Sequence, residues 1–146
     1  MAIREILTNE DPVLRKVSRP IENFDERLSE LISDMRDTLE KAQGVGLAAV
    51  QVGFLKRVVI LKIDDREFVL INPKIVKTHG RQTGDEGCLS VPGRTESITR
   101  PARVRLHALD EHGKEIMLSG EGLFARAVCH EIDHLDGILY YDRITV

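Results

Sequence analysis

The chain has 146 residues, which fits one compact domain, and 42% of them are hydrophobic, which is enough to fill a core of that size. Its formal net charge of −3 lacks the basic excess that is typical of nucleic-acid-binding proteins, and the balance of 21 basic and 24 acidic residues argues against disorder. No uninterrupted apolar run exceeds four residues, which excludes a transmembrane helix.

The start of the chain and its even composition bear on location and domain organisation. Residues 1–6 lack an apolar stretch of signal-peptide length, so we expect a cytoplasmic protein. Neither an internal repeat nor a linker rich in Gly, Pro or Ser divides the sequence, so we expect a single domain over residues 1–146. The short length and modest charge are most simply those of a monomer. We expect no membrane partner and no direct nucleic-acid binding.

The first element in chain order is an amphipathic helix. Over residues 25–41 the apolar side chains recur at helical spacing, which places them on one stripe. Asn23, followed three residues later by Glu26, is a helix start signal, and Gly44 is a stop signal. The pattern predicts a helix with one apolar and one polar face.

Strands and a second helix follow. β-branched residues and alternating hydrophobicity favour the strands, and the turn sequence at residues 110–113 predicts an antiparallel hairpin. A second stretch of helical spacing ends before Gly137, a residue type common just after helices. This order predicts an α+β fold with a mostly antiparallel sheet. The expected strands are residues 57–63, 67–72, 103–109 and 114–118, and the expected second helix is residues 122–136.

A metal-binding motif lies in this second helix. His130 and His134 are four residues apart, so both imidazoles project from one helix face and can bind one divalent metal. Glu131 lies beside them as a candidate general base. The alternative is a surface helix whose two histidines are merely solvated.

The third ligand should come from upstream. The extended metalloprotease pattern requires a final His where this chain has Tyr140, and neither His nor Glu follows His134. Among the upstream candidates, Cys88 is favoured because Gly87 lets the backbone approach closely. A Cys/His/His set leaves a fourth position open for water, which is typical of catalytic sites. The other upstream candidates, each more simply an exposed histidine, are His79, His107 and His112.

Three separated segments of the sequence carry recognisable motifs: Gly44-Val45-Gly46-Leu47-Ala48-Ala49-Val50-Gln51, Glu86-Gly87-Cys88-Leu89-Ser90 and His130-Glu131-Ile132-Asp133-His134-Leu135-Asp136-Gly137. In this order and spacing they make the sequence resemble the peptide deformylase family. The resemblance extends to shorter matches across most of the chain. It implies antiparallel β-sheets around the helix that carries the two histidines, and an enzyme that hydrolyses the formyl group from the initiator methionine of new polypeptides, releasing formate.

The resemblance also implies roles for particular residues. Glu131 would be the general base and acid, while Gln51 and the backbone N–H of Leu89 would bind the developing oxyanion. Val45 and Gly46 would contact the substrate, Gly46 through its backbone. The residues implied as metal ligands are Cys88, His130 and His134. The implied methionine substrate requires an apolar slot, whose candidate walls are Val45, Leu47, Leu123 and the inner face of the last helix.

The resemblance implies one divalent metal per chain, with Fe²⁺ as the native metal and Zn²⁺ or Ni²⁺ as other occupants. Ligand spacing alone would have indicated zinc, and a thiolate ligand is compatible with both Zn²⁺ and Fe²⁺. The implied substrates are N-formyl-methionyl peptides, met as nascent chains at the ribosome. The family usually has Gln before the His-Glu pair, where this chain has Cys129, a position outside the ligand set.

Two other functions fit parts of the sequence. A metallopeptidase that cuts internal peptide bonds would share the two histidines, but the missing downstream ligand counts against it. A protein that binds metal or formyl-peptide ends without turnover would also keep the ligands. Glu131 and Gln51 count against that reading, because simple binding needs no general base.

Overall fold

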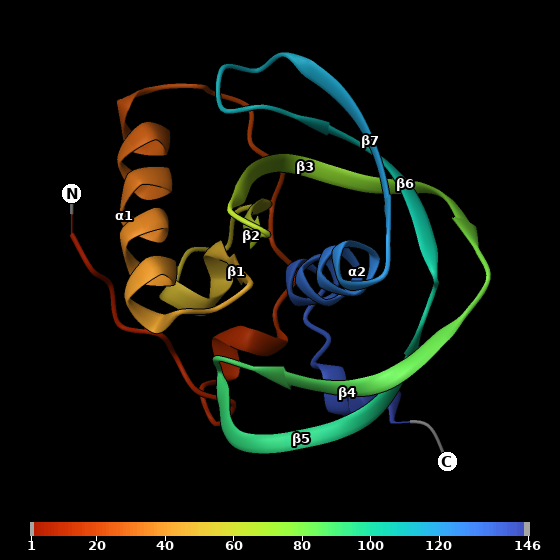
Figure 1. Cartoon of the computed structure of the whole chain (residues 1–146). Coiled ribbons are helices and arrows are strands. Elements are labelled where there is room, and N and C mark those ends of the chain that lie inside the picture. Colours follow the sequence, from red (N-terminus) through yellow and green to blue (C-terminus); the bar gives the residue numbers. More distant parts are fainter. Residues whose placement is uncertain (1, 145–146) are drawn as a thin grey trace.

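The computed structural model describes residues 2–144, which form two antiparallel β-sheets and two α-helices (Figure 1). The larger sheet has the strand order β1-β2-β3-β6-β7, and the smaller one is the hairpin β4-β5. The α+β class predicted from the sequence is confirmed. The strands are β1 (Gly46–Ala48), β2 (Val58–Ile63), β3 (Arg66–His79), β4 (Gln82–Cys88), β5 (Val91–Arg100), β6 (Arg103–Leu109) and β7 (Glu115–Glu121), and the α-helices are α1 (Glu26–Ala42) and α2 (Leu123–Leu135).

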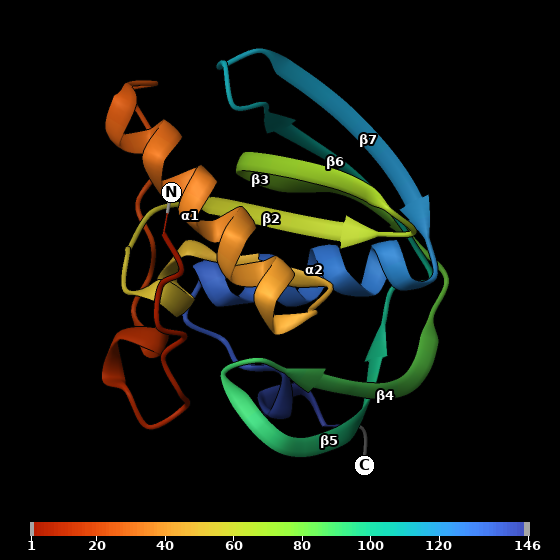
Figure 2. The same ribbon diagram turned by 60° about the vertical axis from the view of Figure 1, so that its left-hand side comes forward.

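Helix α2 lies at the centre of the fold. Figure 1 looks along α2, with the larger sheet curving around one side of it, and Figure 2 shows the β4-β5 hairpin on the opposite side. Because protein surrounds the helix, its buried positions go well beyond one stripe. Ala125, Val128 and Leu135 are fully buried in the core between α2 and the larger sheet. The central position of α2 is what places its polar side chains inside the protein.

Helix α1 covers the outer side of β1 and β2 (Figure 2). Its predicted stripe is buried, but the predicted start signal is wrong: Asp25, not Asn23, is the N-cap, and its carboxylate accepts a hydrogen bond from the backbone N–H of Leu28. At the other end Gln43, rather than Gly44, adopts the left-handed conformation, with φ of 54°. The buried apolar residues of α1 are Leu28, Leu31, Ile32, Met35 and Leu39.

The predicted helices and strands are present, but the short strand β1 and the hairpin β4-β5 were not predicted, and β3 continues beyond the predicted residues 67–72 to His79. β4 contains two glycines and two acidic residues, a composition with little intrinsic preference for strand. Pairing with β5 holds it extended, from Gln82 opposite Arg100 to Cys88 opposite Val91. Gly137 follows α2 with a φ of 75°, as its position in the sequence predicted. Within residues 2–144, neither helix combines the length and apolar character needed to cross a membrane.

Candidate metal centre

Three potential metal ligands meet where β4 ends beside α2. The Cys88 Sγ lies 3.2 Å from Nε2 of His134, and one ligand atom from each of Cys88, His130 and His134 lies within 4.8 Å of the other two. Within residues 2–144 no other group of three His, Cys, Asp or Glu side chains meets in this way. The other upstream histidines lie outside the cluster, and Cys88 is therefore the candidate that the fold brings to the histidine pair.

Helix geometry and one carboxylate orient the two imidazoles. His130 and His134 lie one turn apart on α2, with ring centroids separated by 5.0 Å. Nδ1 of His130 is 2.6 Å from Oε2 of the buried Glu86, which leaves Nε2 free to face the cluster. A carboxylate that accepts a hydrogen bond from a ligand histidine fixes the tautomer and the ring orientation. Sequence reasoning assigned Glu86 no role, and the structure shows it as the group that orients His130.

Glu86 belongs to a buried network of charges. Arg100 donates two hydrogen bonds to its carboxylate, at 3.2 and 2.7 Å, and Arg126 donates a third at 2.8 Å. Burial alone would raise the pKa of Glu86, but the hydrogen bonds from His130 and Arg100 outweigh it and lower the pKa to about 2. Arg100 also contacts Asp133 of α2 at 2.7 Å. Glu86 is therefore held as a carboxylate against the histidine.

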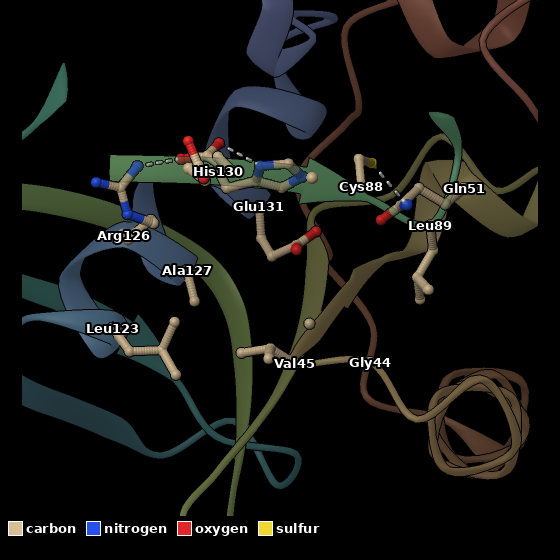
Figure 3. A pocket seen from close by; sticks show the side chains of 14 residues that line it. Gly44, Val45, Gln51, Cys88, Leu89, Leu123, Arg126, Ala127, His130 and Glu131 are labelled. Carbon is tan, nitrogen blue, oxygen red and sulfur yellow. Dashed lines mark hydrogen bonds and ion pairs between the residues drawn. The ribbon is translucent and has the colours of Figure 1, made fainter. Parts of the chain in front are cut away.

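Glu131 points into the space beside the cluster (Figure 3). Its side chain is buried, and its Oε1 has no hydrogen-bond partner within residues 2–144. Burial raises the pKa of Glu131 to about 7. A buried carboxylate with an unsatisfied oxygen is unusual in a folded protein, and it is the arrangement expected of a group that meets water or substrate.

Gln51 lies on the other side of Cys88, on the short 3₁₀ turn Ala49–Val52. Its Oε1 accepts a hydrogen bond from the backbone N–H of Ala48 at 2.9 Å, which turns Nε2 towards Cys88 Sγ at 3.7 Å (Figure 3). Leu89 directly follows Cys88 and lines the same pocket. Gln51 and Leu89, the two residues that the family resemblance implies as oxyanion donors, thus both lie next to Cys88 (Figure 3).

A pocket of about 360 Å³ opens beside the cluster. One side is apolar and includes the partly exposed side chains of Val45 and Leu123 together with Ala127 (Figure 3). Leu47, a predicted wall residue, is instead fully buried in the core beneath α1 and does not line the pocket. Within β1 successive side chains alternate between the two faces, so Leu47 packs towards α1 while Ala48 packs towards α2, and Val45 precedes the strand. The sequence did not indicate Arg126, which lies at the rim and contacts Glu86.

The donor set suits a divalent metal. A thiolate and two imidazoles are borderline-soft ligands that bind Zn²⁺ and Fe²⁺, and three protein ligands leave a coordination position for water. Glu131, with its unpartnered oxygen, lines the same pocket as Cys88 and His130. The protein has antiparallel sheets around a helix with the His-Glu-x-x-His motif, and a cysteine from upstream joins the two histidines. These features place it in the class of metal-dependent hydrolases.

Comparison with known proteins narrows the class to one family. The chain matches the family model of polypeptide deformylase over residues 3–146. It is 51% identical over 144 residues to a peptide deformylase of Caldicellulosiruptor bescii, covering 99% of this chain and 87% of the relative. The crystal structure of a peptide deformylase from Legionella pneumophila superposes with a TM-score of 0.96 at 46% identity, covering 99% of this chain and 87% of that one. The Thermotoga maritima peptide deformylase superposes with a TM-score of 0.97 at 36% identity, covering all of both chains. The chain belongs to the polypeptide deformylase family.

Proposed function

We propose that this chain performs the deformylase reaction with the groups gathered around Cys88. As a member of its family it is a metal-dependent hydrolase that removes the N-terminal formyl group from new polypeptides. The observation that carries the assignment to this site is the close approach of three ligand atoms, within 4.8 Å, beside the buried and unpartnered carboxylate of Glu131. Cys88, His130 and His134 hold the metal. When bound, the metal lowers the pKa of a water molecule to about 7 and so makes hydroxide available at neutral pH.

Glu131 moves the protons of the reaction. Hydrolysis breaks the formyl C–N bond and adds a water oxygen to the formyl carbon, so the water must lose a proton and the departing amine nitrogen must gain one. The Glu131 carboxylate takes the first proton and returns it to the amine nitrogen. Its pKa of about 7, which burial raises from the ordinary value, suits a group that must both accept and donate a proton near neutral pH.

Gln51 and Leu89 stabilise the charge that develops on the formyl oxygen. As the carbonyl carbon becomes tetrahedral, its oxygen becomes negative, and fixed N–H donors lower the energy of that state. The Gln51 amide and the Leu89 backbone N–H serve as these donors, while Val45 and Gly46 contact the substrate, Gly46 through its backbone. Support comes from their positions around Cys88, because all four residues line the same pocket.

We further propose Fe²⁺ as the metal that gives the highest activity, with Zn²⁺ and Ni²⁺ as alternative occupants. The thiolate of Cys88 accepts any of these metals, so the proposal rests on the family. The substrates are N-formyl-methionyl ends of nascent chains, with the methionine side chain against the apolar side of the pocket. We propose that the protein meets them at the ribosome in the cytoplasm as a monomer.

Formate release tests the function directly. Anaerobically purified protein is reconstituted separately with Fe²⁺, Zn²⁺ and Ni²⁺ and given a formyl-Met peptide or the same peptide with a free amine. We expect formate from the formylated peptide, the highest rate with Fe²⁺, and no cleavage of internal bonds in either peptide. A fully loaded protein that releases no formate with any metal would contradict the proposal, and so would cleavage of an internal peptide bond.

Gly46→Ala should reduce activity through Glu131. A Cβ at position 46 would lie 2.7 Å from Oε2 of Glu131 and 2.9 Å from a methyl group of Leu61, so the carboxylate has to move. A displacement of about 1 Å in a catalytic group lowers kcat by about 10²-fold. The matched control is Gly84→Ala, whose Cβ would make an ordinary contact with Arg126 at 3.5 Å. Equal kcat values for the two variants would contradict the predicted role of the close approach.

Glu86→Gln should weaken metal binding. The amide keeps the size of the side chain but removes the charge that Arg100 and His130 face, and changes of this kind behind a ligand histidine cost about 10–100-fold in metal affinity or activity. Titration with a competing chelator measures the affinity. Glu96→Gln is the control, because Glu96 forms an exposed ion pair with Arg94 on β5. An unchanged affinity in Glu86→Gln would show that His130 needs no help from this carboxylate.

A further inference from the structure

Ser90 is fully buried directly behind the Gln51 amide and has no part in the mechanism described so far. Its Oγ accepts a hydrogen bond from Nε2 of Gln51 at 3.0 Å. The orientation of that amide follows from chemistry: the backbone N–H of Ala48 is a donor, so the atom that it meets at 2.9 Å must be the amide oxygen of Gln51. The nitrogen of the amide therefore faces both Ser90 and Cys88.

The two contacts together define the plane of the Gln51 amide. The nitrogen carries two hydrogens, and one of them is donated to Ser90. The second points to the side of the pocket, where it makes a long hydrogen bond of 3.7 Å to Cys88 Sγ (Figure 3). With the amide oxygen held by Ala48 and one N–H held by Ser90, rotation about the last side-chain bond would break two buried hydrogen bonds, each costly to leave unmade.

Ser90 is itself held in place. Its backbone N–H donates to Cys88 Sγ at 3.4 Å, and its carbonyl oxygen accepts a hydrogen bond from the backbone N–H of Asn9 at 2.8 Å. The serine is thus fixed both to the candidate metal ligand and to the N-terminal segment. Because the backbone of Ser90 is fixed, its hydroxyl can hold the Gln51 amide in one orientation.

We propose that Ser90 is a positioning residue that keeps the second N–H of Gln51 on the pocket side, beside Cys88, where it can donate to the reacting carbonyl oxygen. This inference rests on the proposed function, because it requires Gln51 to be an oxyanion donor. A preorganised donor needs no reorientation as charge develops, which is the source of its catalytic effect. Ser90 thereby acts on the transition state through Gln51 and does not touch the substrate.

Steady-state kinetics of a double-mutant cycle test the proposal. Removing an oxyanion donor outright costs about 10²–10³-fold in kcat, and we expect this range for Gln51→Ala. Ser90→Ala frees the amide without removing it, so we expect a smaller loss in kcat, about tenfold, with KM and metal content nearly unchanged. In the Gln51→Ala background the Ser90→Ala change should have no further effect on kcat.

The matched control is Ser18→Ala, because Ser18 is also buried but its hydroxyl has no hydrogen-bond partner within residues 2–144. We expect wild-type kcat for this variant. A second readout is independent of turnover: in ¹H–¹⁵N NMR spectra of the zinc-loaded protein, the side-chain amide signals of Gln51 are identified by their loss in Gln51→Ala. They should shift, and their exchange with solvent should accelerate, in Ser90→Ala.

The outcomes separate the two proposals. Wild-type kcat in Ser90→Ala, together with a large loss in Gln51→Ala, would overturn the positioning role and leave the oxyanion role intact. A loss in Ser90→Ala that persists in full in the Gln51→Ala background would also overturn it, since Ser90 would then act by another route. Wild-type kcat in Gln51→Ala would overturn the oxyanion role and the Ser90 proposal with it.

Discussion

Glu131→Gln should bind the metal as well as the wild type does and lower kcat by about 10²–10⁴-fold, the usual contribution of a positioned proton-transfer group. Glutamine has nearly the same shape as glutamate, so the buried position can accept it. Its amide cannot take a proton from water at neutral pH, and the departing amine then has no proton donor. Formate release measures kcat, and elemental analysis of the purified protein measures the bound metal.

Asp136→Asn is the control for Glu131→Gln. It makes the same carboxylate-to-amide change at the C-terminal end of the same helix. There Asp136 forms an ion pair of 3.0 Å with Arg57, and it does not line the pocket. We expect this variant to retain wild-type kcat. A Glu131→Gln enzyme that holds metal and turns over at the wild-type rate would refute the assignment of proton transfer to Glu131.

Cys88→Ala should abolish formate release by removing the metal. The change deletes the negative ligand of the set and leaves two imidazoles, so the loss of affinity should exceed the cost of about 10–100-fold that a change behind a ligand produces. Metal content after dialysis and formate release before and after added Fe²⁺ are the measurements. Partial recovery of activity at high Fe²⁺ is expected, because His130 and His134 remain.

Cys129→Ala provides the matched thiol deletion. Cys129 lies on α2 next to His130, but it is buried and outside the ligand cluster, and burial raises the pKa of its thiol to about 11. We expect this variant to keep its metal. If Cys129→Ala lost its metal while Cys88→Ala retained it, Cys129 rather than Cys88 would be the ligand, and the proposed ligand set would be wrong.

The elements that were predicted well depend on local interactions. The stripe of α1, the β-branched residues of β2 and the turn between β6 and β7 each contain their own signal within a short stretch of sequence. The hairpin β4-β5 has no such signal, because its polar and glycine-rich first strand becomes extended only by pairing with the second. Asn23 failed as a cap for a related reason: Asp25, two residues on, offers an equally good acceptor at the position where the helix begins.

By itself the sequence determined the relation between His130, Glu131 and His134, because a helix places residues at fixed angles wherever it lies in the fold. It also determined the family, through three motifs in a set order. The sequence also favoured Cys88 as the third ligand, but only the tertiary structure brought it to the histidines and placed Glu86 and Ser90 behind the site. Those three residues lie on and just after β4, a strand whose position depends on contacts with distant parts of the chain. Local sequence preference says nothing about such contacts, so the surroundings of the site were set by packing alone.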